Sequence, residues 1–233
     1  MVEVEGKQVF TTLEELVDPA STALVIVDMQ RDFCLPGGSF DQQGIDISMY
    51  PAMMSRLARL LEGARAAGVT AIFVQMTVLP NRMVESPAQL RFIMRLHLAS
   101  RGPLQPLRYT LEGSPGQQIV PQLEPRPEEL TVRKYRSSGF WGTNLDMLLR
   151  SNGMKSVVMT GCTTEGCVES TARDALFNDY YVVVPEDCVA SDDPRQHDAS
   201  LLLMRNRFDV VTSDEILGVW AAAARTERVA ATS

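Results

Sequence analysis

Two cysteines stand five residues apart in the segment TGCTTEGCVEST (160–171), in a chain that has only four cysteines. A zinc site needs three or four clustered Cys, His or carboxylate ligands. The two histidines of the chain, His97 and His197, are each isolated in the sequence, so the pattern does not favour a metal site. A disulfide is disfavoured as well, because four cysteines without a secretory signal are typical of reduced thiols.

Cys167 is the better candidate for chemistry, as a nucleophile. It lies where a predicted strand gives way to a predicted helix, and the dipole and free N–H groups of a helix N-terminus stabilise a thiolate and lower its pKa. The same N–H groups can hold an oxyanion during acyl transfer. We interpret Cys162 as a small buried side chain, and Glu165 and Glu169 as carboxylates favoured by the helix start.

A nucleophilic cysteine needs a base, and neither histidine is expected at the site. His97 falls in an irregular stretch and His197 near the start of a late helix. Asp28 ends the apolar run TALVIVD (22–28), where a partly desolvated carboxylate can take the thiol proton. Lys134 ends another predicted strand. Its charge would keep Asp28 ionised and favour the thiolate.

The elements that position these residues follow from hydrophobic patterning. β-branched apolar runs alternate with segments of helical spacing, which predicts an α/β fold with a mostly parallel sheet covered by helices on both faces. In such sheets ligands bind beyond the carboxyl ends of the strands, so Asp28, Lys134 and Cys167 should face one rim. The predicted strands are 22–28, 69–75, 129–134, 155–161, 180–187 and 209–212, and the predicted helices are 53–68, 143–153, 167–179, 197–208 and 213–227.

Residues 76–128 do not follow this alternation of strands and helices. They are rich in proline and contain one helical piece, 87–102. A long irregular insertion in a compact domain is usually a binding loop or lid, and the alternative is a disordered surface excursion. We expect one domain over residues 1–233, with a lid-like insertion at about 76–128.

The chain resembles the isochorismatase-like cysteine hydrolases. The resemblance covers roughly residues 20–220 and rests on three blocks in the family's order: ALVIVDMQRDF (23–33), RKYRSSGFWGTNLD (133–146) and VVMTGCTTEGCVESTARDA (157–175). It implies a three-layer α/β/α fold around a six-stranded sheet and a catalytic triad of Asp28, Lys134 and Cys167. It also implies a cis peptide between Cys162 and Thr163, with the N–H groups of Thr163 and Cys167 as the oxyanion hole.

The resemblance also suggests the reaction. Isochorismatases that cleave a vinyl ether typically lack the nucleophilic cysteine, and nicotinamidases carry histidine metal ligands after the first block, where this chain has no histidine. We therefore expect no metal and no cofactor, and hydrolysis of a C–N bond in an amide, carbamoyl or ureido compound, with most similarity to the ureidoacrylate group. A vinyl-ether hydrolase and a catalytically silent binding subunit remain the alternatives.

The sequence also predicts pocket residues and partners. Gln30, Phe33, Tyr135, Phe140 and Trp141 are expected to line the substrate pocket. A net charge of −7 and a pI near 5.0 speak against nucleic acid or an anionic membrane as a partner. The N-terminal sequence shows no signal peptide and no apolar run is long enough to span a membrane, which favours the cytoplasm. The resemblance implies a homo-oligomer, dimer or tetramer.

Overall fold

The core of the molecule is a parallel sheet of seven strands. The computed structural model describes residues 1–96 and 108–231, with side chains as far as residue 225. The strand order is β5-β4-β3-β6-β7-β9, and the short β8 pairs with β6. Every pairing within this sheet is parallel. The strands are β3 Thr22–Val27, β4 Thr70–Met76, β5 Leu130–Lys134, β6 Ser156–Cys162, β7 Tyr181–Pro185, β8 Val189–Ala190 and β9 Asp209–Val211.

Six of these strands are those expected from the sequence, and β8 is additional. β3 and β6 are buried at every residue, which explains why their sequences are nearly continuous apolar runs. β8 has only two residues, so it leaves no such pattern.

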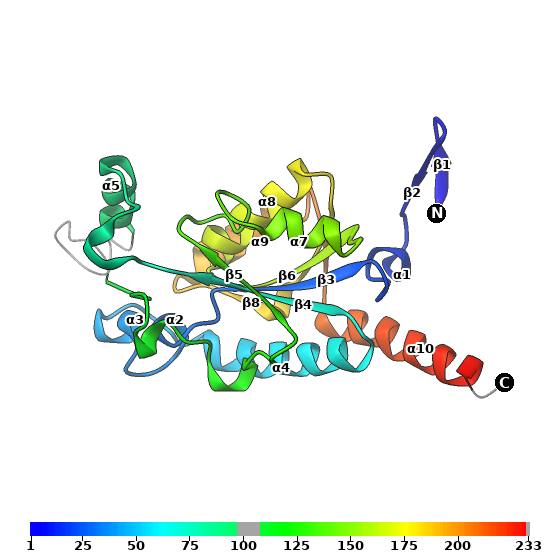
Figure 1. Cartoon of the computed structure of the whole chain (residues 1–233), viewed down its shortest axis with the longest axis horizontal. Coiled ribbons are helices and arrows are strands. Elements are labelled where there is room, and N and C mark those ends of the chain that lie inside the picture. Colours follow the sequence, from blue (N-terminus) through cyan, green and yellow to red (C-terminus); the bar gives the residue numbers. More distant parts are fainter. Residues whose placement is uncertain (97–107, 232–233) are drawn as a thin grey trace.

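Helices cover both faces of the sheet (Figure 1). On one face, α4 and α10 pack with one hydrophobic cluster, and on the other, α7, α8 and α9 pack with a second. The predicted α/β architecture is therefore confirmed. These helices are α4 Tyr50–Ala66, α7 Leu145–Ser151, α8 Glu169–Phe177, α9 Pro194–Met204 and α10 Ser213–Ala231.

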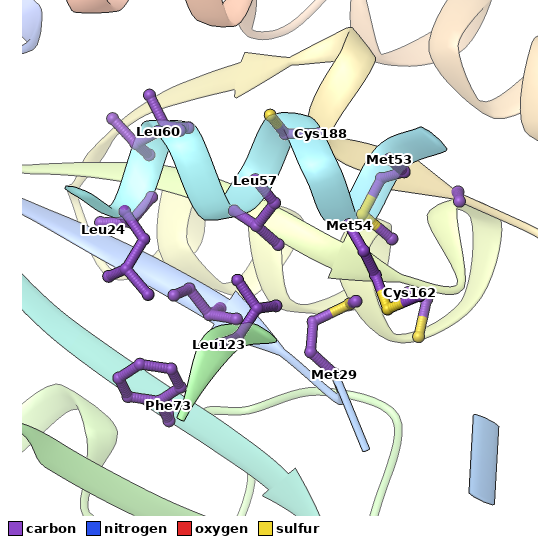
Figure 2. Packing of buried hydrophobic residues seen from close by; sticks show 14 of the residues in the cluster. Leu24, Met29, Met53, Met54, Leu57, Leu60, Phe73, Leu123, Cys162 and Cys188 are labelled. Carbon is purple, nitrogen blue, oxygen red and sulfur yellow. The ribbon is translucent and has the colours of Figure 1, made fainter. Parts of the chain in front are cut away.

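The packing of α4 illustrates how the core forms. The helix begins with proline near its first position, where the missing N–H costs nothing, and presents one apolar stripe to the sheet. Figure 2 shows Met53, Leu57 and Leu60 of α4 above Leu24 of β3 and Phe73 of β4. Each fully buried side chain of this size contributes about 1.5–3 kcal/mol through removal from water.

Short elements surround this framework. An antiparallel hairpin of β1 and β2 lies at the N-terminal end, outside the central sheet, and the sequence patterning did not predict it. Within the described residues, no helix has the length and apolar character required to cross a membrane. The short elements are β1 Val2–Val4, β2 Lys7–Val9, α1 Leu13–Leu16, α2 Arg31–Cys34, α3 Ser39–Gln42 and η5 Glu186–Cys188.

The insertion is tied to the segment that follows β3. The backbone N–H of Thr110 donates to Asp32 Oδ2 at 2.6 Å, and Ile119 forms an antiparallel bridge with Gln30. The predicted helical piece is helical over Pro87–Arg95 (α5), whereas the rest of it beyond residue 96, including His97, lies outside the described residues. The remaining elements of the insertion are η1 Pro80–Arg82, η2 Pro115–Gln117 and η3 Pro121–Leu123.

Candidate active site

Three chemically active side chains meet at the carboxyl ends of the central strands. Asp28 directly follows β3, Lys134 ends β5, and Cys167 lies in the turn after β6. Lys134 Nζ is 2.7 Å from Asp28 Oδ2 and 3.1 Å from Cys167 Sγ, so the ammonium lies between the carboxylate and the thiol. Asp28 and Lys134 are buried. The structure therefore brings together the three residues that the sequence placed on one rim.

Asp28 is held by the neighbouring strand. Its Oδ1 accepts a hydrogen bond from the Met76 N–H at 2.8 Å, at the end of β4, while Oδ2 faces Lys134. The backbone of Asp28 has a positive φ of 54°, which turns the chain sharply out of β3. One oxygen of the carboxylate is thus used for positioning, and the other faces the reactive groups.

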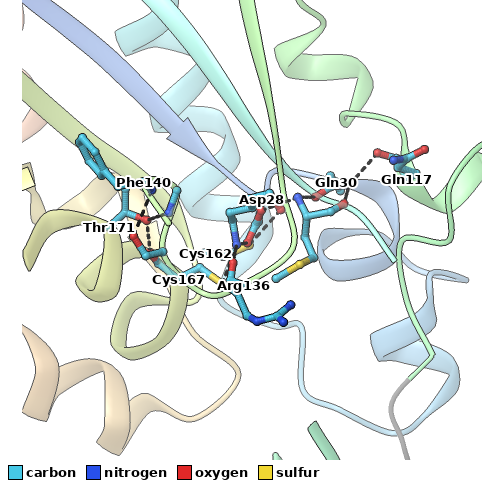
Figure 3. Close-up of polar contacts among 12 residues, drawn as sticks. Asp28, Gln30, Gln117, Arg136, Phe140, Cys162, Cys167 and Thr171 are labelled. Atoms are coloured by element: carbon cyan, nitrogen blue, oxygen red, sulfur yellow. Dashed lines mark hydrogen bonds and ion pairs between the residues drawn. The ribbon is translucent and has the colours of Figure 1, made fainter. Parts of the chain in front are cut away.

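Cys167 lies in a π-helical turn, η4 (Thr164–Val168), that runs directly into α8. The sequence placed it at the first residue of the α-helix, which instead begins two residues later. The peptide bond between Cys162 and Thr163 is cis, as the resemblance implies. The Thr171 hydroxyl donates to the Cys167 carbonyl at 2.6 Å, which anchors the turn to the first residues of α8 (Figure 3).

The ionisation of the site is set first by burial. Burial raises the pKa of the Cys167 thiol to about 12, although the charge of Lys134 opposes the shift. The predicted lowering of this pKa is therefore wrong for the free protein, because removal from water outweighs the helix terminus and the ammonium. The resting form carries a protonated thiol, and a base must remove its proton.

The pKa values of the two charged partners shift as well. Burial raises the pKa of Asp28, and the charge of Lys134 with hydrogen bonds from Lys134, Cys167 and Met76 opposes that shift. For Lys134, burial lowers the pKa, but the charges of Asp28 and Cys167 outweigh it and the net shift is upward. A carboxylate of raised pKa beside a protonated thiol is suited to act as its general base.

A cavity of about 300 Å³ opens above these groups. Asp28, Thr163 and Cys167 line its reactive end. Its apolar wall includes Phe33 from α2, Phe92 from α5 and Tyr109 from the insertion, and the rings of Phe33 and Tyr109 lie 5.2 Å apart between centroids. Segments of the insertion therefore form part of the wall of this site, as a lid would.

Only one of the five predicted pocket residues lines the cavity. Phe33 lines the cavity, whereas Gln30, Tyr135, Phe140 and Trp141 are not among its lining residues. Gln30 is buried, and its amide donates to the carbonyls of Met76 at 2.9 Å and Gln117 at 2.8 Å, which braces the insertion (Figure 3).

The other three residues have different surroundings. The Tyr135 carbonyl accepts a hydrogen bond from the Arg136 side chain, and Phe140 packs near Tyr180. Trp141 is 62% exposed, with the Arg136 guanidinium 5.1 Å from its ring centroid.

Sequence reasoning missed several residues of the cavity wall. The residues missed come from four separate segments of the chain, so no local pattern connects them. They are Phe40, Tyr109, Glu165 and Gln196. Glu165 was interpreted only as a helix-start carboxylate. Its position two residues before Cys167, in the turn of the candidate nucleophile, was the sequence signal that could have placed it at the cavity.

Of the remaining cysteines, Cys162 at the end of β6 also lines the cavity. Cys162 is buried, with its Sγ 3.8 Å from that of Cys34, and all four cysteines are free. His197 Nδ1 lies 2.8 Å from the Thr164 hydroxyl, behind the η4 turn. No three of the His, Cys, Asp and Glu side chains in the described ranges are grouped so that they could hold a metal ion.

Comparison with known proteins places this geometry in a family. Residues 22–216 match the model of the isochorismatase domain. The chain is 37% identical to the ureidoacrylate amidohydrolase RutB of Pantoea ananatis over 180 residues (76% of this chain and 72% of the relative). It is 34% identical to the protein of the same name from Methylobacterium radiotolerans over 211 residues (87% and 82%).

A solved structure is also similar to this chain. The N-carbamoylsarcosine amidase of Thermoplasma acidophilum superposes with a TM-score of 0.63 at 28% identity, covering 83% of this chain and 97% of that one. With the domain match extending over most of the chain, from β3 into α10, the protein belongs to the isochorismatase family.

Proposed function

We propose that the protein is a cysteine-dependent amidohydrolase that cleaves a C–N bond of a small linear amide, carbamoyl or ureido compound through a thioester. The observation that carries this proposal is the contact of one ammonium with both a buried carboxylate and a thiol, where the carboxylate and the thiol line a cavity. The names of the relatives, ureidoacrylate amidohydrolase and N-carbamoylsarcosine amidase, support a carbamoyl or ureido substrate.

In the first half-reaction, Asp28 removes the thiol proton of Cys167 and the sulfur attacks the substrate carbonyl. The N–H groups of Thr163 and Cys167 would stabilise the oxyanion that forms. The tetrahedral intermediate collapses as protonated Asp28 gives its proton to the departing nitrogen, and ammonia or an amine leaves. Throughout, the positive charge of Lys134 compensates the negative charge that moves between the sulfur and the Asp28 carboxylate.

In the second half-reaction, water attacks the thioester carbon and Asp28 accepts one of the water protons. The C–S bond then breaks, the Cys167 sulfur regains a proton from Asp28, and the carboxylic or carbamic acid product leaves. Asp28 therefore acts first as a base and then as an acid in each half-reaction. This role requires a carboxyl group of raised pKa, which is the direction that its burial produces.

The test measures ammonia release from biuret, triuret, N-carbamoylsarcosine, ureidoacrylate and nicotinamide. Native protein is compared with Cys167→Ser and with Cys188→Ser, because Cys188 is a free cysteine as well but is buried away from the cavity lining. We expect release by the native protein and by Cys188→Ser, and a loss of at least a thousandfold in Cys167→Ser.

Two results would contradict the proposal. One is near-native release by Cys167→Ser. The other is no release from any compound by folded native protein, which would return weight to vinyl-ether hydrolysis or to a silent binding subunit. Trapping of a thioester on native protein, detected by mass spectrometry after acid quenching, would support the covalent route independently.

A further inference from the structure

Glu165 is a second carboxyl group in the cavity, and the mechanism above does not use it. It lines the same cavity as Asp28 and Cys167. It belongs to the η4 turn and is separated from Cys167 only by Gly166, so its Cα lies within about 7 Å of that of the nucleophile. Its side chain therefore lines the same cavity as the nucleophile, two positions before it in the η4 turn.

One oxygen of this carboxyl group is left without a protein partner. Oε2 of Glu165 is buried and receives no hydrogen bond from the described residues. A buried carboxylate oxygen without a donor is unfavourable, so a ligand that donates a hydrogen bond to it would be stabilised there. Burial also raises the pKa of Glu165, with Asp192 adding to the shift, while its own N–H and the Ser191 and Thr163 hydroxyls oppose it.

The chemistry of the substrate supplies the missing donor. A ureido carbonyl has a nitrogen on each side. In the proposed reaction, Asp28 donates a proton to the nitrogen that leaves. In ureidoacrylate, biuret and N-carbamoylglycine the retained nitrogen carries an N–H, which needs an acceptor once it is removed from water. A plain carboxamide has carbon in that place and offers no such donor.

We propose that Glu165 is a specificity-determining residue that accepts a hydrogen bond from the retained N–H of the substrate, and so selects ureido and carbamoyl compounds over plain carboxamides. This inference rests on the proposed amidohydrolase function and names its substrate class. The two carboxyl groups then divide the substrate between them, Asp28 on the leaving nitrogen and Glu165 on the retained one. The aromatic wall of Phe33 and Phe92 is left for the remaining substituent.

The test uses pairs of substrates that differ by one group. N-Carbamoylglycine and succinamate differ only by N–H against CH₂ beside the scissile carbonyl, and biuret and malonamide differ in the same way. The ratio of kcat/KM within a pair is measured for native protein, Glu165→Leu and Glu165→Gln. Intrinsic reactivities of the two compounds cancel when the same ratio is compared between proteins. Glu62→Gln is the control, because Glu62 is an exposed carboxylate on α4 that does not line the cavity.

We expect the ureido preference to fall at least tenfold in Glu165→Leu, mainly through KM of the ureido compound, since a hydrogen bond to a charged acceptor is lost. Glu165→Gln keeps an acceptor oxygen and should lose less, about threefold to tenfold, and Glu62→Gln should keep the native ratio. A purely structural role would lower kcat/KM for both members of a pair alike and leave the ratio unchanged.

A ratio within twofold of native in folded Glu165→Leu would overturn the inference. If that variant does not fold, as judged by circular dichroism, an unchanged ratio in Glu165→Gln overturns it instead. These outcomes require ammonia release by native protein that depends on Cys167. The proposed function can therefore stand while this inference fails.

Discussion

Lys134 is a fully buried ammonium that contacts both an acid and a thiol, and this arrangement explains how charge is balanced at the site. A charge removed from water is tolerated only when it is paired and hydrogen-bonded. Here Asp28 provides the pairing, and the Arg136 carbonyl accepts a further hydrogen bond at 3.1 Å. Burial raises the pKa of the Cys167 thiol to about 12, and the charge of Lys134 opposes this shift without overcoming it. The thiol remains protonated until substrate arrives.

This arrangement predicts the pH dependence of the reaction. Catalysis needs Asp28 as the carboxylate, and its pKa is raised from 3.8 by burial, so kcat/KM should rise with pH through a value above 3.8. On the alkaline side, the pKa of Lys134 is raised from 10.5 and that of Cys167 is about 12, so neither group loses its proton below pH 10. A profile of kcat/KM between pH 4 and 10 should show an acid limb followed by a plateau.

Two features of that profile would contradict the assignment. One is an acid limb centred below pH 3.8, which would mean that the base is not raised by burial. The other is a rise in rate between pH 8 and 9, as expected for ionisation of an ordinary thiol. A stability measurement at each pH keeps unfolding from imitating the acid limb.

At the scale of elements, the site depends on how β6 passes into η4. Gly161 has a φ of +109°, and a Cβ there would lie 2.0 Å from the Val27 carbonyl oxygen of β3. No side chain fits this contact without displacing one strand from the other. Since Asp28 follows β3 and Cys167 follows β6, the same close approach fixes the spacing of base and nucleophile.

We therefore expect Gly161→Ala to destabilise the fold by about 3 kcal/mol or more and to lower kcat/KM in the fraction that stays folded. Gly153→Ala is the matched control, because Gly153 also has a positive φ, 71°, but no atom lies within 4 Å of its built Cβ. That variant should lose only about 1 kcal/mol. Urea unfolding measures both free energies. Equal losses in the two variants would argue against the steric contact.

The sequence predicts these elements better than it predicts the pocket. The six main strands are evident because their buried, β-branched runs contrast with helical spacing, and the parallel-sheet rule then brings Asp28, Lys134 and Cys167 to one rim. The direction of a side chain beyond a strand end depends on loops that pack there later. Gln30 therefore turns toward Met76 and Gln117 instead of the cavity, and the burial that raises the Cys167 pKa could not be foreseen.

At the scale of the whole molecule, the sheet separates two hydrophobic clusters. Side chains of α4 and α10 pack together in the same one. Trp220 of α10 is almost fully buried, and its indole N–H donates to the Val17 carbonyl at 2.8 Å, before β3. One side chain thus ties the last helix to the segment that leads into the first strand of the central sheet. Trp220 does not line the cavity.

Stability and catalysis should therefore separate at Trp220. Trp220→Phe keeps an aromatic ring but leaves the Val17 carbonyl unpaired, and should cost about 1–3 kcal/mol. Trp220→Ala also leaves a large cavity, and should cost about 3–5 kcal/mol. Thermal unfolding should rank the proteins native, Phe, Ala. At 25 °C, folded Trp220→Phe should keep kcat/KM within twofold of native. A tenfold loss of kcat/KM in that folded variant would mean that the packing of α10 is coupled to the site through the hydrophobic cluster that Trp220 shares with the cavity residues Phe33 and Phe40.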